Sequence, residues 1–222
     1  MEAHIIWDWN GTLLDDFHIS LKATNVALMN IDVLPLNSEE YRSLYCVPVY
    51  DFYRKVLGRK PTLIEWENIG KKFSTIYKHE ILDAPLAKDV LDLLHKRRRH
   101  SICSLMERDL LIKMLESFGI SSHFTEIHGR TTPLATEGKY AHLKQHVNNL
   151  INNWGVKKEE IVVIGDTADD ADSAQELGLA SILYSGGTFN HQRLAATGKP
   201  VVNTLIEAVT LADYLVKEKK HV

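Results

Sequence analysis

Near its N-terminus the chain reads His4-Ile5-Ile6-Trp7-Asp8-Trp9-Asn10-Gly11-Thr12-Leu13-Leu14-Asp15. A short apolar run that ends in turn residues is typical of a buried strand, and Gly11 supplies a tight turn just after it. Asp8 therefore stands at the carboxyl end of that strand, where a carboxylate is costly unless it binds something. The stretch predicts one strand of a parallel sheet with a functional site at its end.

Short apolar runs alternate with longer helical patterns along most of the chain, which is typical of a parallel sheet flanked by helices. Several runs are almost entirely apolar, as expected for strands covered on both faces. We expect strands at His4–Trp7, Ser101–Ser104, Phe124–His128, Ile161–Ile164, Ser181–Tyr184 and Val201–Val202. We expect helices between them at Asp89–Lys96, Arg108–Phe118, Lys139–Ile151 and Ser173–Leu177. The chain is therefore predicted to be an α/β protein.

One segment interrupts this alternation, from about Asp16 to Asp83. It offers no convincing strand, and prolines punctuate its helical patterns. The expected helices are Ile19–Met29, Tyr50–Leu57 and Trp66–Ile81. We expect residues 16–83 to form an inserted, all-helical cap domain over the carboxyl end of the sheet, where α/β proteins bind ligands. Residues 1–15 and 84–222 would then form the α/β core.

Composition excludes several classes of protein. Of 222 residues, 45% are hydrophobic and 25% charged, which argues against disorder. The 26 basic and 29 acidic residues give a net charge of −3, so neither nucleic acid nor an anionic membrane is expected as a partner. Two cysteines suit a reducing compartment, and neither a signal peptide nor a membrane span of roughly 18 apolar residues is evident. We expect a soluble, cytoplasmic protein.

A second acidic loop follows the expected fourth strand and reads Ile164-Gly165-Asp166-Thr167-Ala168-Asp169-Asp170. Two acidic loops at the tips of neighbouring strands can converge on one hard cation, and Mg²⁺ prefers oxygen ligands. Ser104 stands at the expected tip of the second strand, and Lys139 opens a helix near the same edge. Carboxylates, a hydroxyl and an ammonium together suit phosphoryl transfer, which depends on positioning and charge neutralisation.

These residues give the chain a resemblance to the haloacid dehalogenase-like (HAD) hydrolases over essentially its whole length. Asp8-Trp9-Asn10-Gly11-Thr12-Leu13 resembles the family's first motif, Asp-x-Asp-Gly-Thr-Leu, and Gly165-Asp166-Thr167-x-x-Asp170 resembles its fourth. Ser104 matches the second motif and Lys139 the third by order and strand position. The pattern is most similar to phosphoglycolate phosphatase-like and phosphomutase-like members. The implied fold is a Rossmannoid parallel sheet with an inserted helical cap.

The resemblance also implies a role for each motif residue. Asp8 would attack phosphorus and become an aspartyl-phosphate. Ser104 and Lys139 would hold the phosphoryl oxygens, with help from backbone N–H groups of the loop from Trp9 to Gly11, and Thr12 would steady that loop. The implied ligands of Mg²⁺ are Asp8, the backbone carbonyl of Asn10, Asp166 and Asp170. The implied function is Mg²⁺-dependent hydrolysis of a small phosphorylated metabolite, with the oligomeric state left open.

Position 10 departs from the family pattern, because the chain has Asn10 where the family's phosphatases have an acid–base aspartate. An amide neither gives a proton to a leaving oxygen nor takes one from water, and such catalysis is worth roughly 10²–10⁴-fold. Two alternatives to a phosphatase therefore stay open. One is a catalytically weak protein that binds a phosphorylated ligand or a partner, and the other is a phosphotransferase or mutase.

Several residues compete for these roles or have simpler explanations. Asp169 competes with Asp170 for the metal, although the spacing favours Asp170, and Lys144 is a rival to Lys139. His142 and His146 lie at i and i+4 like half of a zinc site, but no third ligand is evident and we expect a solvated helix face.

In the expected cap, Arg42 and Arg54 are the cations best suited to bind an anionic substrate group. The aromatic residues of the same segment are predicted to be mostly cap core, with one or two facing the substrate. They are Tyr45, Tyr50, Phe52 and Tyr53.

Overall fold

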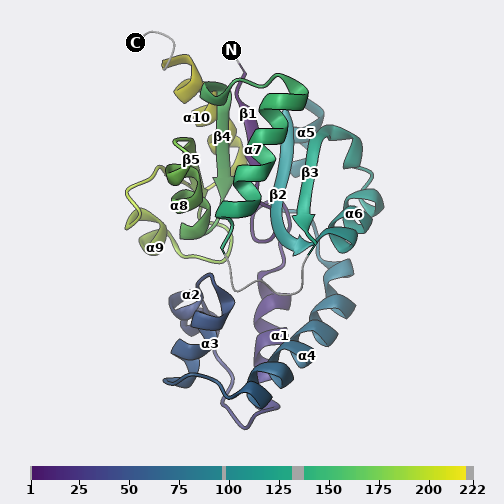
Figure 1. Ribbon diagram of the computed structural model, residues 1–222, viewed down its shortest axis with the longest axis vertical. Helices are drawn as coiled ribbons and strands as arrows, with labels where there is room; N and C mark the ends of the chain where they lie inside the picture. Colours follow the sequence, from purple (N-terminus) through teal and green to yellow (C-terminus); the bar gives the residue numbers. More distant parts are fainter. Residues whose placement is uncertain (1, 97–98, 132–137, 219–222) are drawn as a thin grey trace.

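The computed structural model describes residues 2–96, 99–131 and 138–218. A six-stranded parallel sheet lies at its centre, with the strand order β3-β2-β1-β4-β5-β6 (Figure 1). The strands are β1 (His4–Trp7), β2 (His100–Glu107), β3 (Phe124–Arg130), β4 (Ile161–Gly165), β5 (Ala180–Tyr184) and β6 (Val201–Val202). The expected α/β sheet is confirmed.

Helices cover both faces of this sheet because successive strand residues point to opposite sides. Ile5 and Trp7 of β1 belong to one buried cluster, whereas Ile6 belongs to the other. The first cluster packs under α5 (Val90–Lys96), α6 (Arg108–Ser117) and α10 (Leu205–Glu218), and the second under α7 (Tyr140–Trp154) and α8 (Ala168–Glu176). The remaining elements of this part are α9 (His191–Ala195) and the 3₁₀ turns η2 (Ser121–His123) and η3 (Lys158–Glu160).

Residues 16–83 are helical and contain no strand. Their elements are α1 (Phe17–Met29), α2 (Ser38–Leu44), α3 (Val49–Leu57), α4 (Leu63–Glu80) and η1 (Ile81–Asp83). The strand arrowheads point toward this segment, which we call the cap (Figure 1). Its two ends lie side by side, since Asp15 N–H donates to Pro85 O at 2.9 Å. The three helices expected in this segment are confirmed, and its independence as a domain stays a prediction.

Three local differences from expectation have physical causes. Strand β2 runs to Glu107 through an irregular register against β3, so Ser104 lies within the strand and not at its tip. Helix α8 begins at Ala168, before the expected Ser173, because a capping box between Thr167 and Asp170 fixes its first turn. Helices α2, α9 and α10 are additional to those expected, and α2 begins with a capping box at Asn37. Among the described helices, none has both the length and the apolar character needed to cross a membrane.

Candidate active site

Three carboxylates converge at the carboxyl edge of the two central strands. Asp8 follows β1, Asp166 follows β4, and Asp170 lies in the first turn of α8. One oxygen from each lies within 4.8 Å of the others. The pairing of β1 with β4 brings the loops together, because Trp7 is in register with Ile164 and Asp8 N–H donates to Ile164 O at 2.9 Å.

Lys139 joins two of these acids. It stands just before α7, and its residue is only 2% exposed. The ammonium Nζ lies 2.6 Å from Asp8 Oδ1 and also donates to Asp170 Oδ1. Its backbone N–H donates to Asp169 Oδ2 at 2.9 Å, so Asp169 positions Lys139 while Asp170 contacts the charge. Asp170, and not Asp169, thus belongs to the acidic cluster, and its assignment to the metal stays a prediction.

The cluster has more negative than positive charge. Burial raises the pKa of Asp8 to about 7 against the opposing attraction of Lys139. Burial, followed by the charges of Asp8 and Asp170, raises the pKa of Asp166 well above its usual value. Burial is the largest single influence on the pKa of Lys139 and acts to lower it, but the charges of Asp170, Asp8 and Cys103 and the hydrogen bond to Asp170 together outweigh burial and raise the pKa. Three carboxylates, of which Asp166 and Asp170 are buried and Asp8 is half-buried, could hold a divalent cation beside the one ammonium, and an all-oxygen donor set fits Mg²⁺.

The loop after β1 packs closely against the loop that follows β4. Gly11 has φ +71°, and a Cβ there would lie 2.3 Å from Asp166 Oδ2, so only glycine fits. Thr12 is fully buried, and its hydroxyl donates to Asp166 Oδ1 at 3.4 Å, which agrees with a steadying role. The Gly11 N–H donates to Asp16 Oδ1 and Leu14 O, so this amide is already used within the loop.

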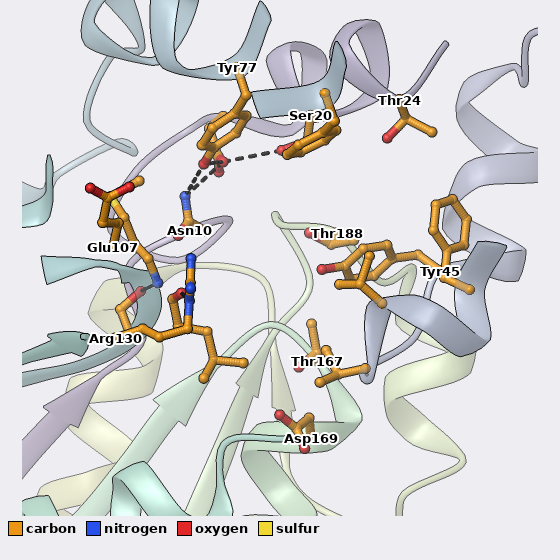
Figure 2. A pocket seen from close by; sticks show the side chains of 18 of the residues that line it. Asn10, Ser20, Thr24, Tyr45, Tyr77, Glu107, Arg130, Thr167, Asp169 and Thr188 are labelled. Atoms are coloured by element: carbon orange, nitrogen blue, oxygen red, sulfur yellow. Dashed lines mark hydrogen bonds between the residues drawn. The ribbon is translucent and has the colours of Figure 1, made fainter. Parts of the chain in front are cut away.

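Asn10 is fixed by two partners that sequence reasoning missed. Its Nδ2 donates to Asp16 Oδ2 at 2.8 Å and to Tyr77 Oη at 2.7 Å, and the Tyr77 hydroxyl donates to the same Asp16 oxygen at 3.0 Å (Figure 2). Burial raises the pKa of Asp16 despite these hydrogen bonds. In the sequence, only the adjacent acids Asp15 and Asp16 could have indicated a partner for Asn10. Tyr77 lies 67 residues further along the chain, so no local pattern connects it with Asn10.

The remaining motif residues occupy varied positions. Ser104 is buried and lines the same cavity as Asp8, with its hydroxyl accepting from Met106 N–H at 3.0 Å. The indole of Trp9 is fully buried and packs against Phe118, so only its backbone faces the loop. The assignment of Ser104 and Trp9 to substrate binding stays a prediction.

The rival residues are placed elsewhere. Lys144 is exposed and lies over the ring of Tyr140. His146 is fully buried, and its Nε2 lies 2.9 Å from Ser101 Oγ, so the expected solvated helix face is wrong at this position. The apolar side of α7 turns His146 toward the sheet, while His142 pairs with His128 at 3.2 Å.

A cavity of about 260 Å³ extends from these acids into the cap (Figure 2). Asp8, Asn10 and Lys139 line its floor, and aromatic side chains line much of its cap side. Neither Arg42 nor Arg54 is among the lining residues. The site is therefore covered by the cap, but without the cap arginines that the sequence suggested.

Fold and site together define an α/β protein with a buried acidic centre at the carboxyl edge of its sheet, beneath a set of helices. The sequence model of the family described as "Haloacid dehalogenase-like hydrolase" matches residues 5–184, and the chain belongs to this family. The chain is similar to a phosphoglycolate phosphatase from Synechococcus elongatus, with 22% identity in an alignment that covers 86% of this chain and 88% of the relative. It is also similar to a phosphoglycolate phosphatase from Chromobacterium violaceum, with 24% identity and coverage of 93% of this chain and 95% of the relative. It also resembles the structure of a haloacid dehalogenase-like hydrolase from Streptococcus pneumoniae, with a TM-score of 0.77, 18% identity and coverage of 95% and 98%.

Proposed function

We propose that this enzyme hydrolyses a phosphate monoester of a small metabolite through an aspartyl-phosphate on Asp8. The observation that supports this most directly is the buried Lys139 ammonium, which contacts Asp8 and Asp170 beside Asp166. A cation held against a nucleophilic carboxylate can receive phosphoryl oxygens as the phosphate enters. The free cysteines, Cys46 and Cys103, are compatible with a cytoplasmic location.

The first step forms a bond from an Asp8 carboxylate oxygen to phosphorus and breaks the bond from phosphorus to the leaving oxygen. Lys139 orients Asp8 and offsets charge on the transferred group. Mg²⁺ bound by Asp8, Asp166, Asp170 and the Asn10 carbonyl would neutralise further charge on the phosphoryl oxygens. Water then attacks the phosphorus atom, the bond from phosphorus to the Asp8 oxygen breaks, and the water proton passes to a phosphoryl oxygen of the departing phosphate, which restores the Asp8 carboxylate.

Asn10 has a limited part in both steps. Its two N–H groups are used by Asp16 and Tyr77, so neither is left to donate to the leaving oxygen. Its Oδ1 can accept a hydrogen bond from the attacking water and orient it, as an amide does in some phosphoryl-transfer enzymes. It cannot remove the water proton. We therefore expect aryl and acyl phosphates, whose leaving groups depart without protonation, to be the fastest substrates.

The test is a steady-state assay of p-nitrophenyl phosphate and ethyl phosphate, with Mg²⁺ and with EDTA. We expect the aryl ester to be hydrolysed faster by roughly 10²-fold or more. Asp8→Asn should abolish turnover while circular dichroism stays native, and Asp166→Asn should raise the Mg²⁺ requirement. Full hydrolysis by Asp8→Asn would rule out the mechanism.

A second candidate function is a weakly catalytic protein that binds a phosphorylated ligand, and the fixed amide of Asn10 favours it. It predicts tight binding of phosphate esters with negligible turnover of every ester, including p-nitrophenyl phosphate. A mutase is a third candidate, and activation by a sugar bisphosphate would support it. The names of the two curated relatives make phosphoglycolate a first substrate to assay.

A further inference from the structure

We propose that the substrate's leaving group is an uncharged aromatic group that binds in a chamber within the cap. We define the cap chamber as the part of the cavity lined by Tyr45, Phe52, Tyr53, Trp66, Phe73 and Tyr77. This inference rests on the proposed phosphatase function and names its substrate class.

The wall of the chamber consists of two groups of aromatic rings in contact. The ring centroids of Tyr45 and Phe52 lie 5.4 Å apart, those of Phe52 and Tyr53 5.0 Å, and those of Tyr53 and Trp66 6.0 Å. Phe73 stacks on Tyr77 at 5.2 Å. Aromatic rings prefer such tilted or offset partners, so a planar ligand would extend an existing arrangement.

These rings do more than fill the cap core. Phe52 and Tyr53 are buried in the core of the cap, but Tyr45, Trp66, Phe73 and Tyr77 keep part of their surface open although they line the same cavity. An apolar cavity of roughly 150 Å³ is enough to hold a benzene ring. The cavity of about 260 Å³ therefore has room for a ring beside a phosphate.

The chamber lies where the leaving group must be. Asp8 attacks from the sheet edge, and in-line displacement expels the leaving oxygen on the opposite side of phosphorus. The cap stands on that side of the strand ends (Figure 1). Tyr77 connects the two regions, because its hydroxyl bonds Asn10 while its ring lines the chamber.

The charges around the chamber disfavour a second acidic group on the substrate. Arg42 donates to the backbone oxygens of Gly187 and Thr188 and lies over the ring of Phe17, away from the cavity lining. Arg54 pairs with Asp51 at 3.4 Å on the surface.

Three cations line the cavity within the described residues. Lys139 pairs with Asp8 and Asp170, Lys78 pairs with Glu107, and Arg130 donates to Leu105 O at 3.0 Å beside the same Glu107 charge. The Asp16 carboxylate adds negative charge at the chamber mouth. A carboxylate on the leaving group would lose its hydration in the chamber. The cations that line the cavity already have acidic neighbours, so they would offer little to offset that loss.

One polar group does face the chamber. The hydroxyl of Tyr45 has no hydrogen-bond partner among the described residues and points into the pocket (Figure 2). A hydroxyl that loses its water when a ligand enters gains from a new partner, so a ring with one hydroxyl or carbonyl substituent would be preferred to an unsubstituted ring.

The decisive assay compares benzyl phosphate, ethyl phosphate and phosphoglycolate with the Mg²⁺-loaded enzyme. All three have primary alkoxide leaving groups, so their rates differ through binding more than through leaving-group departure. We expect kcat/KM for benzyl phosphate to exceed that for ethyl phosphate by at least about tenfold, and phosphoglycolate to be the poorest. Phe73→Leu should reduce the benzyl-to-ethyl ratio several-fold, whereas Trp154→Leu, an exposed tryptophan outside the cavity, should leave it unchanged.

A binding measurement separates this inference from the proposed function. Benzylphosphonate and ethylphosphonate, which are not hydrolysed, are titrated calorimetrically against the full-length enzyme with Mg²⁺. Tighter binding of benzylphosphonate by about tenfold supports the chamber even if no ester is turned over. Equal binding with Asp8-dependent hydrolysis overturns the chamber and leaves the phosphatase intact. A preference for phosphoglycolate that Arg130→Gln removes also overturns it, and assigns anion recognition to Arg130.

Discussion

Asn10 and Asp16 form a pair whose chemistry depends on both members. Replacing Asn10 by Asp alone would place a second carboxylate where Asp16 Oδ2 now accepts from the amide at 2.8 Å. Two carboxyl groups at that distance share one proton, and the pKa of one of them rises strongly. The single change therefore restores an acid in a site that is not arranged for it.

We expect Asn10→Asp to raise kcat for ethyl phosphate only modestly, and Asn10→Asp with Asp16→Ser to raise it by up to roughly 10²-fold. A hydroxyl at position 16 could donate to the new carboxylate as well as accept from it. The measurement is kcat on ethyl phosphate for the wild type and all three variants, with Asp16→Ser as the control. Equal rates for the single and the double variant would show that Asp16 does not restrain position 10.

The sequence predicted the acidic centre of the site but missed the residues around Asn10. Asp8, Asp166 and Lys139 each stand at the end of an expected strand or the start of an expected helix, so topology alone places them together. The contact between Asn10 and Tyr77 joins the first loop to the end of α4. No local pattern encodes such a contact, since it depends on how the cap packs on the sheet.

At the scale of elements, one histidine of α7 is buried between that helix and the sheet. His146 of α7 packs against Ser101 of β2, and burial, together with the charges of His128, His4 and Lys139, lowers the pKa of His146 to about 3. Below the ordinary value of 6.5, the unfolded chain takes up a proton at this position that the folded chain does not. The free energy of unfolding therefore decreases as the pH falls from about 6.5 toward 3.

We expect this one histidine to account for a loss of about 2 kcal/mol between pH 6.5 and pH 5. His146→Gln should remove this loss, so that its free energy of unfolding falls by about 2 kcal/mol less than that of the wild type over the same pH range, as measured by urea denaturation. His79→Gln changes an exposed histidine and serves as the control. Parallel slopes for the wild type and His146→Gln would contradict the assignment.

Elements with a regular apolar pattern were predicted well, and those fixed by tertiary context were not. The strands β1 and β4 lie in the sheet interior and have continuous apolar sequences, so their bounds match closely. Beyond Ser104, β2 continues as Leu105-Met106-Glu107 because β3 pairs with it across an irregular register. The extension of β2 depends on its pairing with β3, and the sequence of β2 or of β3 taken alone does not indicate it.

At the scale of the whole molecule, two arginines fasten the cap to the α/β part. Arg193 of α9 donates to the backbone oxygens of Arg42 and Tyr45 in the cap. In return, Arg42 donates to the backbone oxygens of Gly187 and Thr188. Each guanidinium thus binds backbone oxygens of the opposite part of the molecule, and opening the cap breaks both sets of hydrogen bonds.

We expect Arg193→Gln to increase the population of open cap by about tenfold or more, because hydrogen bonds to charged groups are worth about 1.5–3 kcal/mol each. Hydrogen–deuterium exchange of α2 and of the residues up to Tyr45 should accelerate accordingly. Arg59→Gln removes an ion pair within the cap and should leave this exchange unchanged. Unaltered protection of α2 in Arg193→Gln would show that other contacts hold the cap closed.

The hydrogen bonds around Asn10 also control how fast this residue is deamidated. An Asn-Gly pair in a flexible chain loses ammonia when the glycine nitrogen attacks the side-chain carbonyl, which leaves aspartate or isoaspartate. Here the Gly11 nitrogen is engaged by Asp16 and Leu14, and the Asn10 amide is engaged by Asp16 and by Tyr77 of the cap. When the cap opens, Tyr77 moves away from Asn10 and the amide loses this hydrogen bond. We therefore expect deamidation at position 10 to accumulate in proportion to the time that the cap spends open. Mass spectrometry of stored protein should show faster deamidation in Arg193→Gln than in the wild type.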